Sequence, residues 1–104
     1  MMKKYLLVYR GSVQPENGQQ HMKDWMTWVH DMGDAMIDPG TPVFPSVTVT
    51  SKHVHDTDSS NPICGISLIQ ADSQEAANAL AQSSPHLVIG GTIEVAETMN
   101  LPMA

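Results

Sequence analysis

The sequence predicts an α+β fold in which a four-stranded antiparallel sheet carries two helices on one face. Short runs of β-branched and aromatic residues, typical of strands, occur near both ends of the chain and in its middle. Two other segments repeat their apolar residues every three or four positions, which is typical of helices. The segments follow one another as strand, helix, strand, strand, helix, strand.

The first strand and the first helix come from the opening third of the chain. Lys4–Tyr9 is an apolar, aromatic-rich run that we expect to form a buried strand. From Gln19 the spacing becomes helical, and Gly33 is expected to end that helix. The expected apolar stripe of the helix consists of Met22, Trp25, Met26, Val29 and Met32, widened by Trp28.

The next segment predicts the second strand of the sheet. Ala35–Asp38 is expected to be a short extended piece, followed by a turn over Pro39–Pro42. Ser46–Thr50 alternates with a period of two, so we expect this segment to be the second strand. Its buried face would carry Val47 and Val49.

The second half of the chain predicts a strand, a helix and a last strand. A polar loop or hairpin end is expected over His53–Pro62 and the third strand over Ile63–Ile69. Asp72 is expected to cap the second helix, and Ser84–Pro85 to end it. The fourth strand is Thr92–Glu97, reached through a glycine pair. The packing stripe of the second helix consists of small residues at Ala76, Ala77 and Ala81, with Leu80.

This order of elements is that of a ferredoxin-like βαββαβ unit. Both helices would cover one sheet face and leave the other open. A chain of 104 residues, expected to be one domain over residues 1–104, buries only ~60–65% of its unfolded surface. A second copy of the same sheet is the simplest cover for the open face, so we expect a homodimer.

Composition and charge exclude several classes of partner. The net charge is −6 and the five basic residues are scattered, which argues against nucleic acid. The apolar run after Lys3 and Lys4 is too short for a secretory leader, and no stretch has transmembrane length, so no membrane is expected. The one cysteine, Cys64, cannot form an internal disulfide, which favours the cytoplasm and predicts a buried small hydrophobic residue.

The chain resembles the YCII-related (DGPF domain) family along nearly its whole length. The segments that carry the resemblance are Lys4–Tyr9, Trp25-x-x-Trp28 ahead of Met32–Ala35, Asp38-Pro39-Gly40-x-Pro42, Gly65–Ser73, and Pro85-His86-Leu87 with Gly90–Glu97. The resemblance implies a dimeric α+β barrel, in agreement with the fold expected above.

The resemblance implies less about activity. In the better-known branch of the family, enzymatic function was proposed from a His–Asp pair in a cleft. The position of that histidine is occupied here by Met22, with His21 one residue away. The Asp-Pro-Phe segment of the branch corresponds here to Ser84-Pro85-His86. The family's acid–base pair is therefore not carried over to this chain.

His86 and Asp38 are the candidate catalytic residues. A histidine directly after a helix-ending proline lies where a carboxylate or a helix terminus can tune it, and Asp38 begins a bend that could aim it into a cleft. Within hydrogen-bond reach they would form an acid–base pair. The alternative is that His86 caps helix carbonyls and Asp38 only forms a turn.

Other candidates concern ligands and metals. We expect ligand contacts from Arg10, His21, Trp25 and Trp28, although a tryptophan pair at helical spacing is also typical of a core. His53 and His55 are weak candidates for zinc or copper, against the alternative of a solvated hairpin tip, so no metal site is assigned. Gly90-Gly91 opens a strand and lacks the glycines of a phosphate loop, and no cofactor is expected.

Two functions are consistent with these residues. The first is a cofactor-independent enzyme that acts on a small molecule in the cleft by His86 and Asp38 acid–base chemistry. The second is a non-catalytic module that binds a ligand or another protein. The sequence does not decide between an enzyme and a binding protein.

Overall fold

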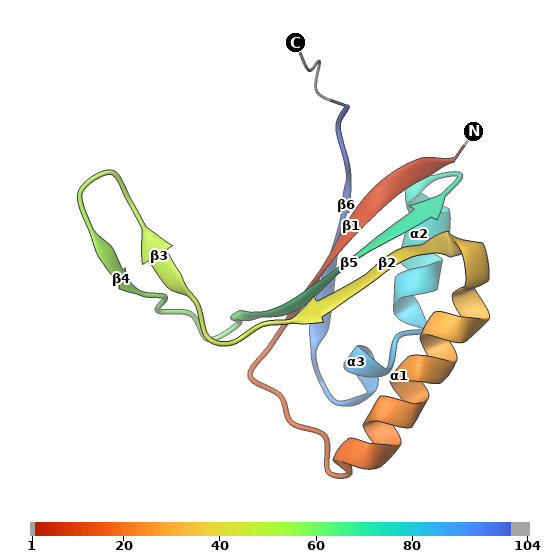
Figure 1. The fold of residues 1–104 in the computed structure, drawn as a ribbon, viewed down its shortest axis with the longest axis horizontal. Coiled ribbons are helices and arrows are strands. Elements are labelled where there is room, and N and C mark those ends of the chain that lie inside the picture. Colours follow the sequence, from red (N-terminus) through yellow and green to blue (C-terminus); the bar gives the residue numbers. More distant parts are fainter. Residues whose placement is uncertain (1, 101–104) are drawn as a thin grey trace.

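The computed structural model describes residues 2–100 and has an α+β architecture (Figure 1). In chain order the elements are β1 (Lys3–Arg10), α1 (Gly18–Met32), the 3-10 helix η1 (Gly33–Ala35), β2 (Met36–Pro42), β3 (Val47–Val49), β4 (Val54–Asp56), β5 (Ile63–Ala71), α2 (Gln74–Gln82), α3 (Pro85–Val88) and β6 (Thr92–Glu97). Within residues 2–100, no helix combines the length and the apolar character that crossing a membrane requires.

The main sheet has four strands in the order β2-β5-β1-β6, and every neighbouring pair is antiparallel. Both α1 and α2 lie on the same face of this sheet (Figure 1). The expected four-stranded antiparallel sheet with its helices on one face is confirmed, and the arrangement is compatible with a ferredoxin-like fold.

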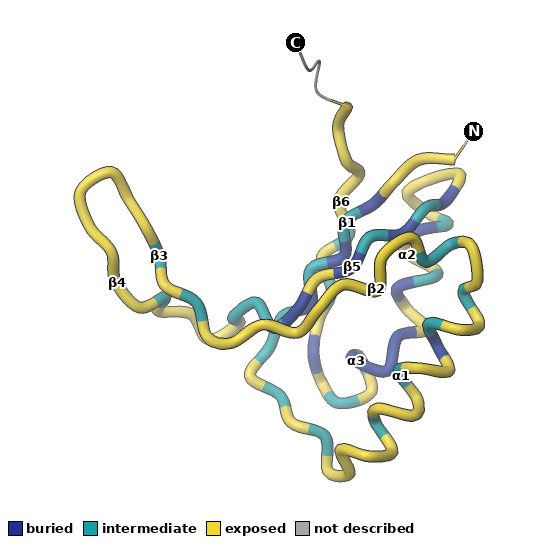
Figure 2. The backbone as a smooth tube through the Cα atoms, in the orientation of Figure 1, coloured by how far each residue is buried: buried dark blue, intermediate teal, exposed yellow. Residues whose placement is uncertain are grey.

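The core lies between this sheet and the helices. Side chains alternate along a strand, so Tyr5, Leu7 and Tyr9 of β1 point together into the core. The buried positions gather along β1 and β5 and at the neighbouring helices (Figure 2). The small residues of α2 allow the helix to approach the sheet closely, and the expected stripe is confirmed. The buried apolar cluster consists of Tyr5, Leu7, Tyr9, Trp28, Ile69, Ala71, Ala77 and Ala81.

Helix ends follow the expected chemistry with two differences. Gly33 ends α1 with φ 53°, a conformation that glycine adopts without strain, as expected. Ser73, and not Asp72, caps α2, because the Ser73 side chain accepts a hydrogen bond from the amide of Ala76. Pro85 does follow the end of α2, but it also begins the short helix α3, for which its fixed φ is suited.

The second strand of the sheet is β2, and not the expected segment 46–50. The Asp-Pro-Gly sequence suggested a turn, yet it lies inside an edge strand. An edge strand has one partner and tolerates a proline, and the pairing of β2 with β5 shifts register on either side of Asp38. Gly40 has φ 74°, and a Cβ there would lie 1.7 Å from the carbonyl oxygen of Ile66. Only glycine permits this approach.

The alternating segment 46–50 forms a separate two-stranded hairpin with β4. The hairpin projects away from the sheet and the helices (Figure 1). Val47 and Val49 were expected to be buried, and this prediction is wrong, because both are exposed. Alternation correctly indicated a strand with two different faces, but the apolar face has no cover within residues 2–100.

The apolar stripe of α1 is narrower than expected. Met22 and Met26 are exposed, whereas Trp25, Val29 and Met32 pack on the core and Trp28 is buried. The helix is thus rotated so that its tryptophans face the sheet. Trp28 Nε1 donates to Ser83 Oγ at 2.9 Å and to the Leu80 carbonyl at 3.3 Å, which ties α1 to the end of α2.

The second face of the sheet carries a patch of apolar side chains. Leu6 lies opposite Leu68, and Val8 opposite Ile66, on the face away from the helices. We call these four residues the open face. Ile66 is exposed and the other three are half-buried. The one-sided cover that the sequence predicts is therefore present in this chain.

Candidate functional site

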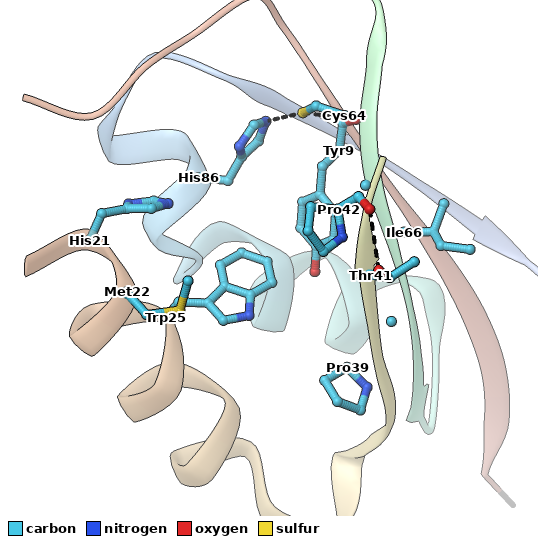
Figure 3. Close-up of a pocket in the computed structure, with 12 residues that line it drawn as sticks. Tyr9, His21, Met22, Trp25, Pro39, Thr41, Pro42, Cys64, Ile66 and His86 are labelled. Carbon is cyan, nitrogen blue, oxygen red and sulfur yellow. Dashed lines mark hydrogen bonds between the residues drawn. The ribbon is translucent and has the colours of Figure 1, made fainter. Parts of the chain in front are cut away.

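A cavity of about 360 Å³ opens between α1, the ends of β2 and β5, and α3 (Figure 3). Its wall is mainly apolar and aromatic, with a few polar atoms. The lining residues are Tyr9, His21, Met22, Trp25, Pro39, Gly40, Thr41, Pro42, Cys64, Gly65, Ile66 and His86. The volume falls within the range of about 300–1,000 Å³ that small-molecule sites occupy.

The first turns of α1 build one wall. His21 and Trp25 are four residues apart, so they share one helix face, and their rings are tilted with centroids 6.5 Å apart. Trp25 meets Tyr9 edge-to-face at 5.1 Å, an arrangement that aromatic rings favour. In Figure 3 the His21 and Trp25 side chains lie across the cavity from Pro39 and Pro42.

The opposite wall is the irregular stretch of β2 from Pro39 to Pro42. Besides the tight approach of Gly40, a chain of two hydrogen bonds holds this wall against the sheet. Tyr9 Oη donates to Ser67 Oγ at 2.8 Å, and Ser67 Oγ donates to the Pro39 carbonyl at 2.7 Å. Burial raises the pKa of Tyr9 to about 12, and the Ser67 hydrogen bond opposes that shift. The Tyr9 hydroxyl is therefore a neutral structural donor.

His86 of α3 closes the inner end of the cavity. The residue is 94% buried, and Nε2 lies 2.9 Å from the carbonyl oxygen of Arg10. A carbonyl can only accept, so Nε2 carries the proton. The backbone of Gly91 packs directly against the ring, since a Cβ there would lie 2.1 Å from Nε2. Glycine at position 91 is therefore required for this placement.

The thiol of Cys64 lies beside His86 on the same wall. Cys64 Sγ is 3.8 Å from His86 Nε2, and it donates to the Tyr9 carbonyl at 3.3 Å (Figure 3). Burial raises the pKa of the Cys64 thiol. The residue is half-buried and lines the cavity, so it is less enclosed than expected. At neutral pH it is a protonated thiol and a weak nucleophile.

The structure brings three of the sequence-predicted site residues together and separates the others. His86, His21 and Trp25 line the cavity. Trp28 lies about one turn after Trp25 on α1 and is buried in the core. Arg10 is outside the cavity wall, where Nε pairs with Glu94 Oε1 at 2.6 Å on the far side of the sheet.

Asp38 belongs to the second group. It is exposed on β2, and its Oδ1 accepts a hydrogen bond from the Gly40 amide at 2.8 Å. Its neighbours Pro39 and Gly40 line the cavity, whereas Asp38 is not among the described lining residues. The carboxylate thus forms the turn that lets Gly40 approach β5.

His53 and His55 lie on the hairpin and are not among the described residues that line the cavity. His55 is exposed, and its Nδ1 lies 2.9 Å from the Asp56 carbonyl. In the described part of the chain, no three His, Cys, Asp or Glu side chains gather closely enough to hold a metal ion. These residues give a metal no more than two neighbouring imidazoles.

The cavity also contains residues that the sequence did not single out as site residues. Tyr9, Cys64 and Gly65 meet there because β1 and β5 are neighbours in register, with Tyr9 opposite Gly65. Glycine opposite a tyrosine leaves room beside the ring, and this pairing is a signal for a hollow. It becomes visible only once the strand register is known.

Comparison with protein-family models finds no match to this chain, and comparison with curated proteins finds none either.

Proposed function

We propose that this chain binds a small, planar and largely apolar molecule in the cavity between α1, β2 and β5. The observation that carries the proposal is the shape and chemistry of the wall. The ring of Trp25 faces the prolines of β2 across a space of about 360 Å³, and the ring of Tyr9 borders the same space. Flat apolar ligands gain most from such a wall, because aromatic surfaces stack on them and exclude water.

Binding is favoured over catalysis because the two polar side chains at the inner end of the cavity are already engaged. His86 Nε2 donates to a backbone carbonyl, and the Cys64 thiol is protonated and donates as well. Asp38, which lies outside the wall, accepts from Gly40. His21 is half-buried at the start of α1 and is the side chain best placed to form a hydrogen bond with a ligand. One such group is enough to orient a small apolar molecule.

The proposal extends to family and assembly. We propose that the chain is a YCII-related protein that acts in the cytoplasm as a homodimeric α+β barrel. Several residues that carry the family resemblance line the cavity, among them Trp25, Gly40, Gly65 and His86. The open face supports the homodimer, because it is an apolar surface that a second copy can cover.

A cofactor-independent enzyme with His86 and Asp38 as its acid–base pair is the second candidate. It is favoured by the position of His86 on the cavity wall. If the pair acts together, Asp38→Asn will alter the imidazole ¹⁵N shifts of His86 in an NMR spectrum. If the cavity only binds a ligand, wild type and Asp38→Asn will show the same imidazole ¹⁵N shifts, those of a ring protonated at Nε2, because the partner of Nε2 is the Arg10 carbonyl.

Cys64 offers a direct test of binding, because it is the only cysteine and it lines the cavity. We expect indole, a neutral planar probe, to slow alkylation of Cys64 by iodoacetamide at least tenfold at saturation. The assay belongs at alkaline pH, because burial raises the pKa of this thiol and the thiolate is the reacting form.

The matched control moves the thiol to an exposed position. In the double variant Cys64→Ser, Ser51→Cys, the new thiol lies in the turn between β3 and β4. Its alkylation rate should not respond to indole. Equal rates at Cys64 with and without indole, or equal protection at both positions, would refute binding in this cavity.

A further inference from the structure

The hairpin that connects β2 to β5 projects from the sheet, and most of its residues are exposed (Figure 1). We call residues 43–57 the arm. Cross-strand pairs Val47–Asp56, Thr48–His55 and Val49–Val54 define its register. Alternation then puts the three valines on one side of the arm, with Asp56 at its edge opposite Val47, and Thr48 with His55 on the other side. The large apolar residues exposed along the arm are Val43, Phe44 (91% exposed), Val47 (57%), Val49 (69%) and Val54 (66%).

The side chains on the two sides of the arm differ in whether they have partners within the chain. On the polar side the hydroxyls satisfy one another, with Ser46 Oγ donating to Thr57 Oγ1 at 3.0 Å and Thr48 Oγ1 lying 2.8 Å from the same atom. The valine side has no comparable partners, as the exposure of Val49 and Val54 shows. A two-stranded hairpin alone is at best marginally stable in water, so an apolar side of this kind requires a cover.

The total surface of the chain indicates how much cover is missing. The chain exposes 7587 Å², whereas a compact monomer of 11.3 kDa exposes about 5,700 Å². Its radius of gyration is 15.1 Å, against about 13 Å for a compact domain of this length. The projecting shape of the arm accounts for part of this excess of about 1,900 Å² per chain, which is still more than twice the roughly 800 Å² that each partner buries in a standard interface.

We propose that the arm is a dimerisation arm whose valine side packs on the open face of a second copy of this chain. This inference rests on the homodimer of the proposed function and adds the element that joins the two copies. Two apolar surfaces are present on one chain, the valine side and the open face of Leu6, Val8, Ile66 and Leu68. In a two-fold symmetric dimer, the valine side of each copy packs on the open face of the other. The contact therefore forms twice, and both apolar surfaces of each chain are covered.

A pair of charge-swapped hairpins tests the proposal. Val49→Lys, Val54→Glu changes one cross-strand pair on the valine side, and Thr48→Lys, His55→Glu makes the same change in the adjacent pair on the polar side. Opposite charges across the strands support the hairpin in both variants, and the polar-side variant also gives up the Thr48–Thr57 hydrogen bond, which makes it the stricter control for damage to the hairpin. Light scattering over a concentration series should give a dimer for wild type. We expect the valine-side variant to raise the dimer dissociation constant at least 100-fold and the polar-side variant less than threefold.

Each other outcome has a distinct meaning. A valine-side variant that stays dimeric, or a polar-side variant that dissociates as far, overturns the role of the valine side and leaves the homodimer standing. A monomeric wild type overturns both the arm and the homodimer. Neither result touches ligand binding, which the protection of Cys64 by indole measures separately in the same samples.

Hydrogen exchange on the wild-type protein gives a test that does not depend on how a variant folds. On dilution through the dissociation constant, amides of β3 and β4 should lose protection while those of β1 and β5 keep theirs. Protection of the arm that does not depend on concentration would overturn the proposal.

Discussion

The cavity and the arm are both largely apolar and meet at Pro42. They differ in shape, and they differ in how many of their side chains have partners within the chain. The cavity wall is concave. Its polar atoms form hydrogen bonds within the sheet and its connections, through the Tyr9–Ser67–Pro39 chain and the bond from His86 to Arg10. The arm is a flat ribbon with one satisfied side and one bare side. A concave wall suits a small molecule and a flat apolar surface suits a protein, so shape separates the two roles.

The largest expected effect comes from the glycine that seats the cavity wall on the sheet. Gly40→Ala would put a Cβ 1.7 Å from the Ile66 carbonyl at φ 74°. The strand must then move away from β5, and we expect a loss of at least about 3 kcal/mol in the free energy of unfolding, together with the loss of indole binding. Urea denaturation measures the first effect.

Gly18→Ala is the control for that substitution. A Cβ at Gly18 meets no heavy atom within 4 Å, and φ is not in the left-handed region. Alanine there, at the start of α1, should leave the free energy of unfolding unchanged or raise it slightly. If both variants lose stability alike, the close approach of Gly40 to β5 does not hold the wall.

The two tryptophans should separate stability from binding. Trp28→Phe removes the bonds from Nε1 to Ser83 and Leu80, and we expect it to cost about 1–2 kcal/mol of stability and to change indole affinity less than twofold. Trp25→Leu removes the flat ring from the cavity wall and should weaken indole binding about tenfold, equivalent to about 1.4 kcal/mol. Calorimetric titration and urea denaturation of both variants check this, and a larger affinity loss in Trp28→Phe would contradict it.

Tyr9 makes the stability of the fold depend on pH in the alkaline range. Its pKa in the folded chain is raised from 10.0 to about 12, so the neutral phenol stabilises the fold. This contribution is fully present below pH 10 and is lost as the pH rises toward 12. Tyr9→Phe should cost about 1 kcal/mol at neutral pH and reduce the decline of stability between pH 10 and 12. An unchanged alkaline decline in Tyr9→Phe would show that other groups cause it.

The smallest effect is expected in the arm at concentrations where the chain is monomeric. Val49→Thr keeps the β-branched shape and changes only a side chain that is already exposed. The free energy of unfolding of the sheet and its helices should change by less than about 0.5 kcal/mol. A larger change in dilute solution would mean that the arm contributes to the stability of a single chain.

The sequence predicts strands well where their burial is one-sided or complete, as in Lys4–Tyr9 and Thr92–Glu97. It misplaces the second strand because Asp38-Pro39-Gly40 has turn chemistry, and only the edge position with its register shifts makes a strand of it. The alternation over 46–50 shows that one side is apolar and does not show which chain covers it. That information lies in contacts outside the segment itself.

The same limit applies to the candidate site. His86, His21 and Trp25 can be selected from residue type and position, and all three line the cavity. The partner of His86 is the carbonyl of Arg10, 76 residues away, and no local pattern encodes such a contact. Gly91 is the one local signal, since it leaves room for the imidazole ring. Asp38 is a carboxylate in a suggestive motif, but its Oδ1 accepts from its own turn.

An isotope-filtered NOE spectrum of indole with the ¹³C-labelled protein tests the central claim most directly, because one experiment compares all the apolar surfaces. The account predicts contacts from indole to the side chains of Trp25, Tyr9 and Pro39 in the cavity. Contacts to the methyl groups of Val49 and Val54, or to those of Leu6, Val8 and Leu68 on the open face, in place of the cavity would contradict it.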